Sequence, residues 1–262
     1  VGAVYPNIVV SAKGVRTLNL RSAVVLQTDS NVDAMPTKYI DDIVGRIDRE
    51  FLLIRVEVEG GEEGVRIPVY PLKAGYLRPP VLPPGTTKVF FEPQYNDPAV
   101  NELFQGMSTI TKIKFGKDFN QPVDNLPNTL LYLKFGEDFN QPVDNLPNTL
   151  RHLKFGEFFD QPVDNLPAGL ESLIFGQEFN NPINLRHLTN LSQLSFGLEF
   201  NQSIDKLPGS LKTLWLHGRF NQPVNNLPVW LTSLNISNSS KFNQPVDNLP
   251  VGLTSLNLNN CW

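Results

Sequence analysis

The chain is poor in the residues that build most chemical sites. Its 262 residues include one cysteine, Cys261, and three histidines. A single cysteine excludes an intrachain disulfide framework and cannot complete a zinc site alone. The sequence has no Ser-His-carboxylate spacing, no glycine-rich phosphate loop and no Cys/His metal pattern. We therefore expect no catalytic residue, no cofactor and no metal site, and a protein that is not an enzyme.

Strong net charge and long apolar runs are also lacking. The net charge is -4, which gives no reason to expect a nucleic acid or an anionic membrane as partner. No apolar run approaches the roughly 18 residues of a membrane span, and no signal peptide is visible. Since low cysteine usage fits a reducing compartment, these absences predict an intracellular protein without a membrane span.

An internal repeat fills much of the chain instead. The motif Phe-Gly-x-x-Phe-Asn-Gln-Pro-Val-Asp-Asn-Leu-Pro-x-x-Leu-x-x-Leu returns from about residue 115 onward. A period of 20 to 22 residues is typical of solenoids, in which stacked turns share one core and stabilise one another. The second Phe of the motif marks the period at Phe119, Phe139, Phe159, Phe179, Phe200, Phe220 and Phe242.

Each residue type in one repeat has a structural interpretation. The Leu-x-x-Leu-x-Phe spacing of residues 130–135 predicts a short strand whose Leu and Phe side chains point inward. Gly136 is expected to end the strand at a tight turn, and Phe139 to return inward as a second apolar anchor. Asn140 is suited to bond backbone groups of its own and adjacent turns. Asp144 is expected to cap its own turn.

The Phe-Asn-Gln-Pro segments resemble the FNIP repeat family, a leucine-rich-repeat relative known from social amoebae and giant DNA viruses. Nearly literal copies of the motif stand at residues 119–122, 139–142, 220–223 and 242–245. The resemblance covers at least residues 110–258. It implies a right-handed, parallel-stranded solenoid used for protein binding, often beside an F-box. It also implies host cytoplasm or virion association if the protein is viral. No F-box helix set is visible in residues 1–80.

The fold class predicted for residues 81–262 is mainly β. We expect a leucine-rich-repeat-like, right-handed parallel β-solenoid with irregular or short helical return segments. Its clear repeats begin near residue 110, and residues 82–98 align with the repeat as a cryptic early turn. Residues 1–80 are expected to form a small α+β module or N-terminal cap. Its helix is expected at 36–49, and its hairpin strands at 51–59 and 65–70.

Outward strand positions carry more functional information, because the repeat does not dictate them. Lysines about 4.8 Å apart in a parallel ladder repel one another, so an acidic protein partner would explain a lysine cluster. The alternative is that recently duplicated turns inherited the same lysines. The candidate protein-binding residues on this face are Lys88, Lys112, Lys114, Tyr132, Lys134, His152, Lys154, Ile174 and Trp215.

These observations predict a non-enzymatic protein-protein interaction solenoid that binds through its strand-lined face. It would serve as an adaptor, scaffold or structural component of a larger assembly, viral in the case of a viral protein. No C-terminal cap is apparent, so assembly through the last repeat is also expected. The alternative is a carbohydrate-binding or carbohydrate-active β-solenoid that uses Tyr132, Trp215 and a column of carboxylates. That column consists of Asp124, Asp144, Asp164, Asp205 and Asp247.

Overall fold

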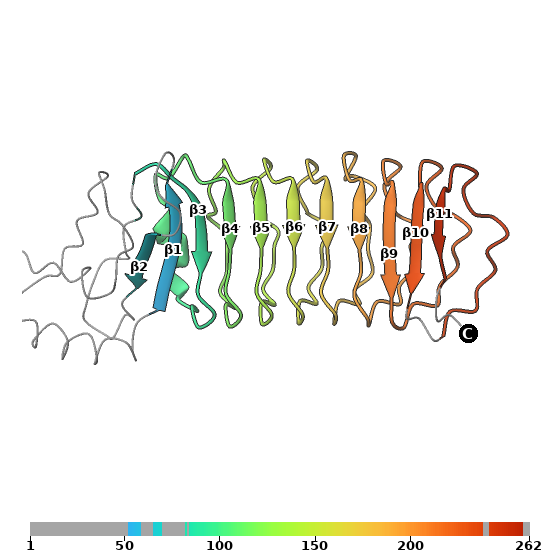
Figure 1. Cartoon of the computed structure of the whole chain (residues 1–262), viewed down its shortest axis with the longest axis horizontal. Coiled ribbons are helices and arrows are strands. Elements are labelled where there is room, and N and C mark those ends of the chain that lie inside the picture. The colour runs from blue at the N-terminus through green and yellow to red at the C-terminus, as the bar shows by residue number, and fades with distance from the viewer. Residues whose placement is uncertain (1–51, 59–64, 70–81, 83, 238–240, 259–262) are drawn as a thin grey trace, which may run out of the picture.

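The computed structural model describes residues 52–58, 65–69, 82, 84–237 and 241–258. Its strands form one 11-stranded sheet in the order β11-β10-β9-β8-β7-β6-β5-β4-β3-β1-β2 (Figure 1). The strands are β1 Leu52–Val58, β2 Val65–Val69, β3 Thr86–Phe91, β4 Lys112–Lys114, β5 Tyr132–Lys134, β6 His152–Lys154, β7 Ser172–Ile174, β8 Gln193–Ser195, β9 Thr213–His217, β10 Ser233–Ser237 and β11 Ser255–Asn257.

Strands β3 to β11 pair in parallel and in the order of the chain, one strand from each turn. The register places equivalent repeat positions side by side, so that Leu133 of β5 lies between Ile113 of β4 and Leu153 of β6. Because strand side chains alternate between the two faces, this register separates an inward core from an outward face. The predicted parallel, in-register solenoid is confirmed.

The core consists of the apolar positions that the repeat predicts. Leu133, Phe135 and Phe139 have no exposed side-chain surface. Phe135 and Phe139 stack with ring centroids 3.7 Å apart, and each also stacks on its equivalent in the next turn, at 5.7 and 6.1 Å. Two aromatic columns therefore run along the solenoid, and each turn is buried mainly against its neighbours.

A ladder of side-chain amides links successive turns. The Asn140 Oδ1 accepts hydrogen bonds from the backbone N–H of Asp160 at 3.0 Å and from the Gln161 amide at 2.9 Å. This confirms the expected role of Asn140 for the adjacent turn. Asp160 keeps the pattern, since its carboxylate accepts the backbone N–H of Asn180 at 2.9 Å. The repeat therefore needs an acceptor at this position, and either Asn or Asp supplies it.

The glycine that follows each of strands β4 to β8 is required by the close approach of the previous turn. A Cβ atom added at Gly136 would lie 1.7 Å from the carbonyl oxygen of Gly116. The same contact with the preceding glycine recurs at Gly156 and Gly176. A side chain at any of these glycines would collide with backbone, so the column of glycines after β4 to β8 permits the close approach of those turns.

The N-terminal end of the parallel ladder is covered by a hairpin. β1 and β2 are antiparallel, as expected from the sequence, and β1 also pairs antiparallel with β3. The early turn is confirmed, because Val89 and Tyr95 are buried and Asn96 accepts the backbone N–H of Asn120 at 2.9 Å. The helix expected at 36–49 lies outside the described residues, and the domain boundary near residue 80 stays a prediction.

Most return segments are irregular, which is one of the two forms that the sequence predicted. Within the described residues the helical segment is the 3₁₀ helix Pro98–Phe104, in the enlarged turn between β3 and β4. It buries Val100, Leu103 and Phe104, so the extra residues of this turn extend the core. Return segments such as 136–151 contain isolated turns instead. The expectation of short helical returns therefore holds for this 3₁₀ segment alone among the described turns.

Candidate protein-binding face

The outward side chains of β3 to β11 form one continuous surface, called the strand face below. The strand register aligns them in two columns, as the sequence predicted. The first column contains Lys88, Lys112, Tyr132, His152, Ser172, Gln193, Thr213, Ser233 and Ser255. The second contains Phe90, Lys114, Lys134, Lys154, Ile174, Ser195, Trp215, Asn235 and Asn257.

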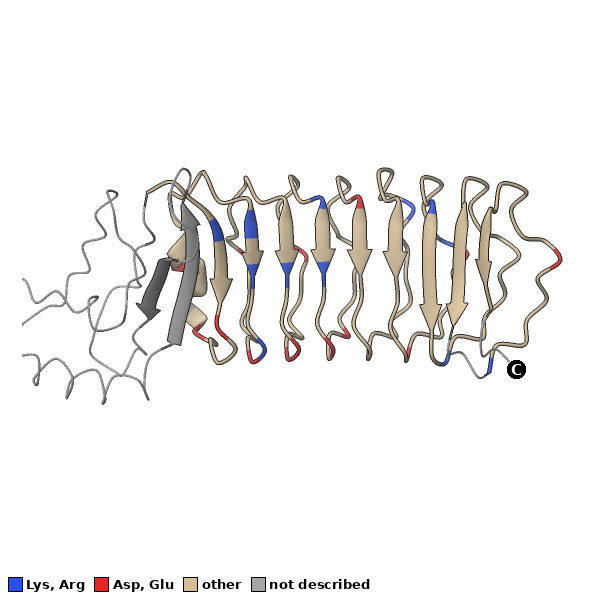
Figure 2. Cartoon of the chain, in the orientation of Figure 1, with Lys and Arg blue, Asp and Glu red and all other residues tan. Residues whose placement is uncertain are grey.

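Charge on the strand face has one sign and lies at one end. The lysines occupy β3 to β6, and strands β3 to β11 contain no Asp or Glu. Figure 2 shows these lysines as blue bands on the strands, with acidic residues on the connecting loops. Although the whole chain is slightly acidic, the N-terminal half of the strand face is therefore basic.

Two of these lysines lie over neighbouring aromatic rings. The Lys112 Nζ is 4.5 Å from the centre of the Tyr132 ring, and the Lys114 Nζ is 5.5 Å from that of Phe90. These are cation–π distances. The Tyr132 ring in turn lies 6.2 Å from the His152 ring, centre to centre. The rings of Tyr132 and Phe90 thus contact neighbouring lysines over the first strands.

Lys134 and Lys154 have no ion pair within the described part of the chain. Glu137, an acidic residue on the loop after β5, pairs with Lys117 at 2.9 Å. This hydrogen bond and charge contact raise the pKa of Lys117. The acidic side chain of Glu137 is therefore paired with a base on the neighbouring loop and not with Lys134 or Lys154.

The C-terminal half of the strand face is neutral. Ile174 and Trp215 are half-buried there among Ser, Thr, Gln and Asn side chains. Trp215 is paired across the sheet with Asn235, whose Oδ1 is buried without a hydrogen-bond partner in the described part of the structure. A large planar side chain on an otherwise polar surface resembles the anchor residues of protein interfaces.

The aspartate column has a different role from the one expected. Asp124 and Asp144 each accept a hydrogen bond at 3.0 Å from an Asn side chain of the next turn, Asn145 and Asn165 respectively. Capping of their own turns was thus the wrong interpretation for these residues, which link neighbouring turns. Asp205 accepts both from Asn226 of the next turn and from Ser203 beside it, and these hydrogen bonds lower its pKa. Within the described residues, no group of three or more His, Cys, Asp or Glu could hold a metal ion.

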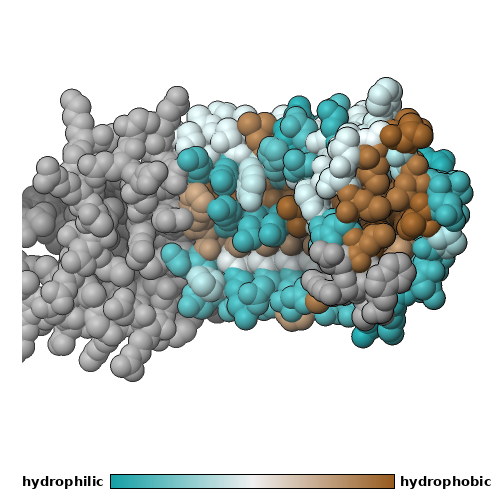
Figure 3. All heavy atoms as spheres, turned by 45° about the vertical axis from the view of Figure 1, so that its right-hand side comes forward, coloured by the Kyte–Doolittle hydropathy of each residue, from teal (hydrophilic) through white to brown (hydrophobic). Residues whose placement is uncertain are grey.

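Exposed apolar residues at the C-terminal end were not among the sequence candidates. Val229 and Trp230 are each 71% exposed, and Val251 is fully exposed. Figure 3 shows apolar surface gathered at this end of the solenoid. A signal was present in the sequence: the two variable positions of Leu-Pro-x-x-Leu change there from small or polar residues to Val and Trp.

The FNIP repeat model matches residues 108–138, 122–158 and 139–177. The chain is similar to a circular leucine-rich-repeat protein of a giant virus, at 33% sequence identity and a TM-score of 0.48. This similarity covers 65% of the chain and 33% of that protein, so the chain spans about a third of its length.

No curated protein matches, and no described helix is long and apolar enough to cross a membrane. The chain therefore contains FNIP repeats, which the family model locates at residues 108–177.

Proposed function

We propose that this chain is a non-enzymatic interaction module whose strand face binds an acidic protein surface. The observation that carries the proposal is the unpaired charge of Lys134 and Lys154, on a face that has no acidic side chain. Two like charges held on adjacent strands repel each other. A carboxylate-rich partner would relieve that repulsion and would be guided to the face by its charge.

The division of the strand face suggests two separate contributions to binding. The basic half would govern the encounter rate and the salt sensitivity. The neutral half would supply an anchor at Trp215, where apolar contact with the partner excludes water. Such a module would serve as an adaptor or as a component of a larger assembly, intracellular or attached to a virion. Residues 1–80 keep no assigned role.

Charge reversal tests the proposal directly. The variant Lys114→Glu, Lys134→Glu and Lys154→Glu should lose an acidic partner that the unchanged chain captures from its native source. The matched control reverses Arg186, Lys206 and Lys241, which are exposed and lie outside the strands, and so changes the net charge equally. Equal capture by both variants, each with an unchanged circular dichroism spectrum, would place the interface elsewhere.

The anchor requires its own measurement. Trp215→Ala should weaken binding about 30-fold, the effect of a typical hot-spot residue, and leave the salt dependence unchanged. Charge reversal should instead flatten the dependence of affinity on ionic strength. If the Trp215 variant binds as tightly as the unchanged chain, the neutral half is not part of the interface.

A carbohydrate site is the alternative, and the geometry gives it less support. Its carboxylates would be those of the aspartate column, of which Asp124, Asp144 and Asp205 accept hydrogen bonds from Asn side chains. Its stacking platform would be Tyr132, but Lys112 lies over that ring. A sugar would therefore have to displace a cation–π contact and would meet carboxylates that already have hydrogen-bond partners.

A further inference from the structure

Acidic residues line the loops that follow strands β4 to β8. We call them the acidic ridge; its members are Asp118, Glu137, Asp138, Glu157, Glu178 and Glu199. These loops stand in register, because each donates a backbone N–H to the loop before it. Asp138 donates to the Lys117 carbonyl at 3.0 Å, and Phe158 donates to the Glu137 carbonyl at 2.9 Å. The acidic ridge therefore runs along the solenoid with the same one-turn spacing as the lysines of the strand face.

Most of the acidic ridge has no matching base. Its members without an ion pair among the residues that the structure describes are Asp118, Asp138, Glu157 and Glu178. The other two members, Glu137 and Glu199, pair with bases on adjacent loops. Like charges one turn apart repel one another, so the ridge would be stabilised by a column of cations with the same spacing. Figure 2 shows the ridge as red loops beneath the blue lysine bands of the strands.

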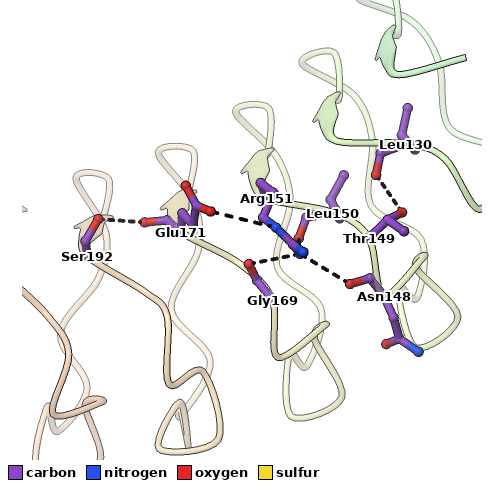
Figure 4. Close-up of polar contacts among 8 residues, drawn as sticks. All are labelled: Leu130, Asn148, Thr149, Leu150, Arg151, Gly169, Glu171 and Ser192. Atoms are coloured by element: carbon purple, nitrogen blue, oxygen red, sulfur yellow. Dashed lines mark hydrogen bonds and ion pairs between the residues drawn. The ribbon is translucent and has the colours of Figure 1, made fainter.

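Beside β6 and β7, the other edge of the strand face pairs its charges within the chain. Arg151 forms an ion pair with Glu171 of the next turn at 3.7 Å. Its guanidinium also donates to the carbonyls of Asn148, Leu150 and Gly169 at 3.3–3.4 Å (Figure 4). The edge where the strands begin is therefore satisfied internally, whereas the edge where they end keeps charge for another molecule.

An exposed aromatic ring interrupts the acidic ridge. Phe158 is 46% exposed, and the equivalent loop position holds Asp138 in the turn before and Glu178 in the turn after. An exposed ring can accept a lysine over its face, as Tyr132 accepts Lys112 in this chain. A partner that presents lysines at one-turn spacing fits both the carboxylates and the ring, and the strand face of this chain is such a surface.

From these observations we propose that the basic strand face binds the acidic ridge of a second copy of this chain. This inference rests on the proposed function, because it names the acidic surface that the strand face binds. In each turn the ridge directly follows the strand, since Asp138 comes four residues after Lys134. A two-fold axis that runs along the solenoid between the two columns exchanges them. Lys134 and Lys154 of each copy then face Asp138 and Glu157 of the other, and the assembly closes at a dimer.

The neutral half of the strand face has a matching change in its loops. Where the strand column changes from lysine to Trp215, the loops change from acidic residues to Leu198 and Arg219. Leu198 is 42% exposed, and its carbonyl accepts the backbone N–H of Arg219 at 2.7 Å, so the two residues lie on adjacent loops. The same axis places Trp215 against this pair, where Leu198 can cover its ring. One symmetry operation thus gives both halves of the strand face a counterpart.

A charge swap tests the proposal by sedimentation of the full 29.4 kDa chain. The unchanged chain should form a dimer that dissociates as ionic strength rises. The variant Lys134→Glu with Lys154→Glu, and the variant Asp138→Lys with Glu157→Lys, should each raise the dimer dissociation constant by about 30-fold or more. An equal mixture of the two variants should restore the dimer, because both contacts of the mixed pair then join opposite charges.

The matched control changes the net charge without touching either column. Arg186→Glu with Lys206→Glu alters the charge as much as the lysine variant does, at exposed positions outside the strands. It should dimerise as tightly as the unchanged chain. Circular dichroism of every variant establishes that the fold is kept, so a lost dimer reports on the interface.

Two outcomes would overturn the inference. The first is an unchanged chain that stays monomeric at every concentration up to about 100 µM. The second is a mixture of the two folded variants that stays monomeric, or a lysine variant that dimerises as tightly as the unchanged chain. A monomeric chain that captures a different acidic protein through Lys134 and Lys154 would overturn this inference and leave the proposed function standing. If reversal of these lysines changes neither dimerisation nor capture, both fail.

Discussion

At the scale of single residues, the turns are joined by side-chain acceptors that serve the backbone of the next turn. Asn140→Ala removes the acceptor for the Asp160 N–H and the Gln161 amide. We expect a loss of about 1–2 kcal/mol in the free energy of unfolding, measured by denaturant titration, because part-buried donors would lose their partner.

Two controls separate this acceptor from general damage. Asn140→Asp should retain most of the stability, because Asp160 already performs the same role for Asn180. Lys154→Ala, at an exposed position, should stay within roughly 0.5 kcal/mol. A shift of equal size for Asn140→Ala and Lys154→Ala would show that the amide ladder contributes nothing to stability.

The glycine column gives a second prediction at this scale. Gly136→Ala places a methyl group against the Gly116 backbone, and backbone can move away only by separating the turns. We expect destabilisation of about 3 kcal/mol or more, at the upper end of overpacking effects. Gly209→Ala is the matched control, since its Cβ would meet nothing within 4 Å. Similar unfolding midpoints for the two variants would contradict the role given to the glycine column.

At the scale of elements, the aromatic columns hold the turns together. Phe139 is fully buried and stacks on Phe119, Phe135 and Phe159. Phe139→Ala should cost about 3–5 kcal/mol, as expected for truncation of a buried aromatic side chain. Phe158→Ala, whose ring is 46% exposed, should cost far less. Equal melting temperatures for Phe139→Ala and Phe158→Ala would contradict the stabilising role of the aromatic columns.

The repeat made most of this fold predictable. The fixed period places Leu133, Phe139 and their equivalents in the core of each turn. The stacking of turns then determines the register of the parallel strands. The forward bonds of Asp144 were not predictable from one turn, because the donor, Asn165, belongs to the next. The position of the 3₁₀ helix Pro98–Phe104 was not predictable either, since the enlarged turn that contains it departs from the repeat.

The candidate site was predictable in position but not in detail. The two columns of the strand face follow from register, so Lys134 and Lys154 were correctly placed side by side. The sequence does not show which lysines form ion pairs, because this depends on loop conformation. In the structure Glu137 forms its ion pair with Lys117 on a loop. Trp230 was missed because the alternation of inward and outward side chains applies to strands only, and Trp230 lies between β9 and β10.

At the scale of the whole molecule, the solenoid separates its surfaces by chemistry. The basic strands lie toward one end, and the neutral strands and the exposed Val229, Trp230 and Val251 lie toward the other (Figures 2 and 3). Because each turn contacts mainly its neighbours, an outward residue in one turn can change without repacking distant turns. Two independent binding surfaces can therefore coexist on one chain.

Lysine footprinting measures whether a partner covers the basic half of the strand face. The chain is acetylated with and without its captured partner, and the modification rate of each lysine is measured by mass spectrometry. We expect Lys134 and Lys154 to be protected by the partner, while the exposed Lys206 and Lys241 react at unchanged rates. Protection of Lys206 and Lys241, with full reactivity at Lys134 and Lys154, would contradict the account.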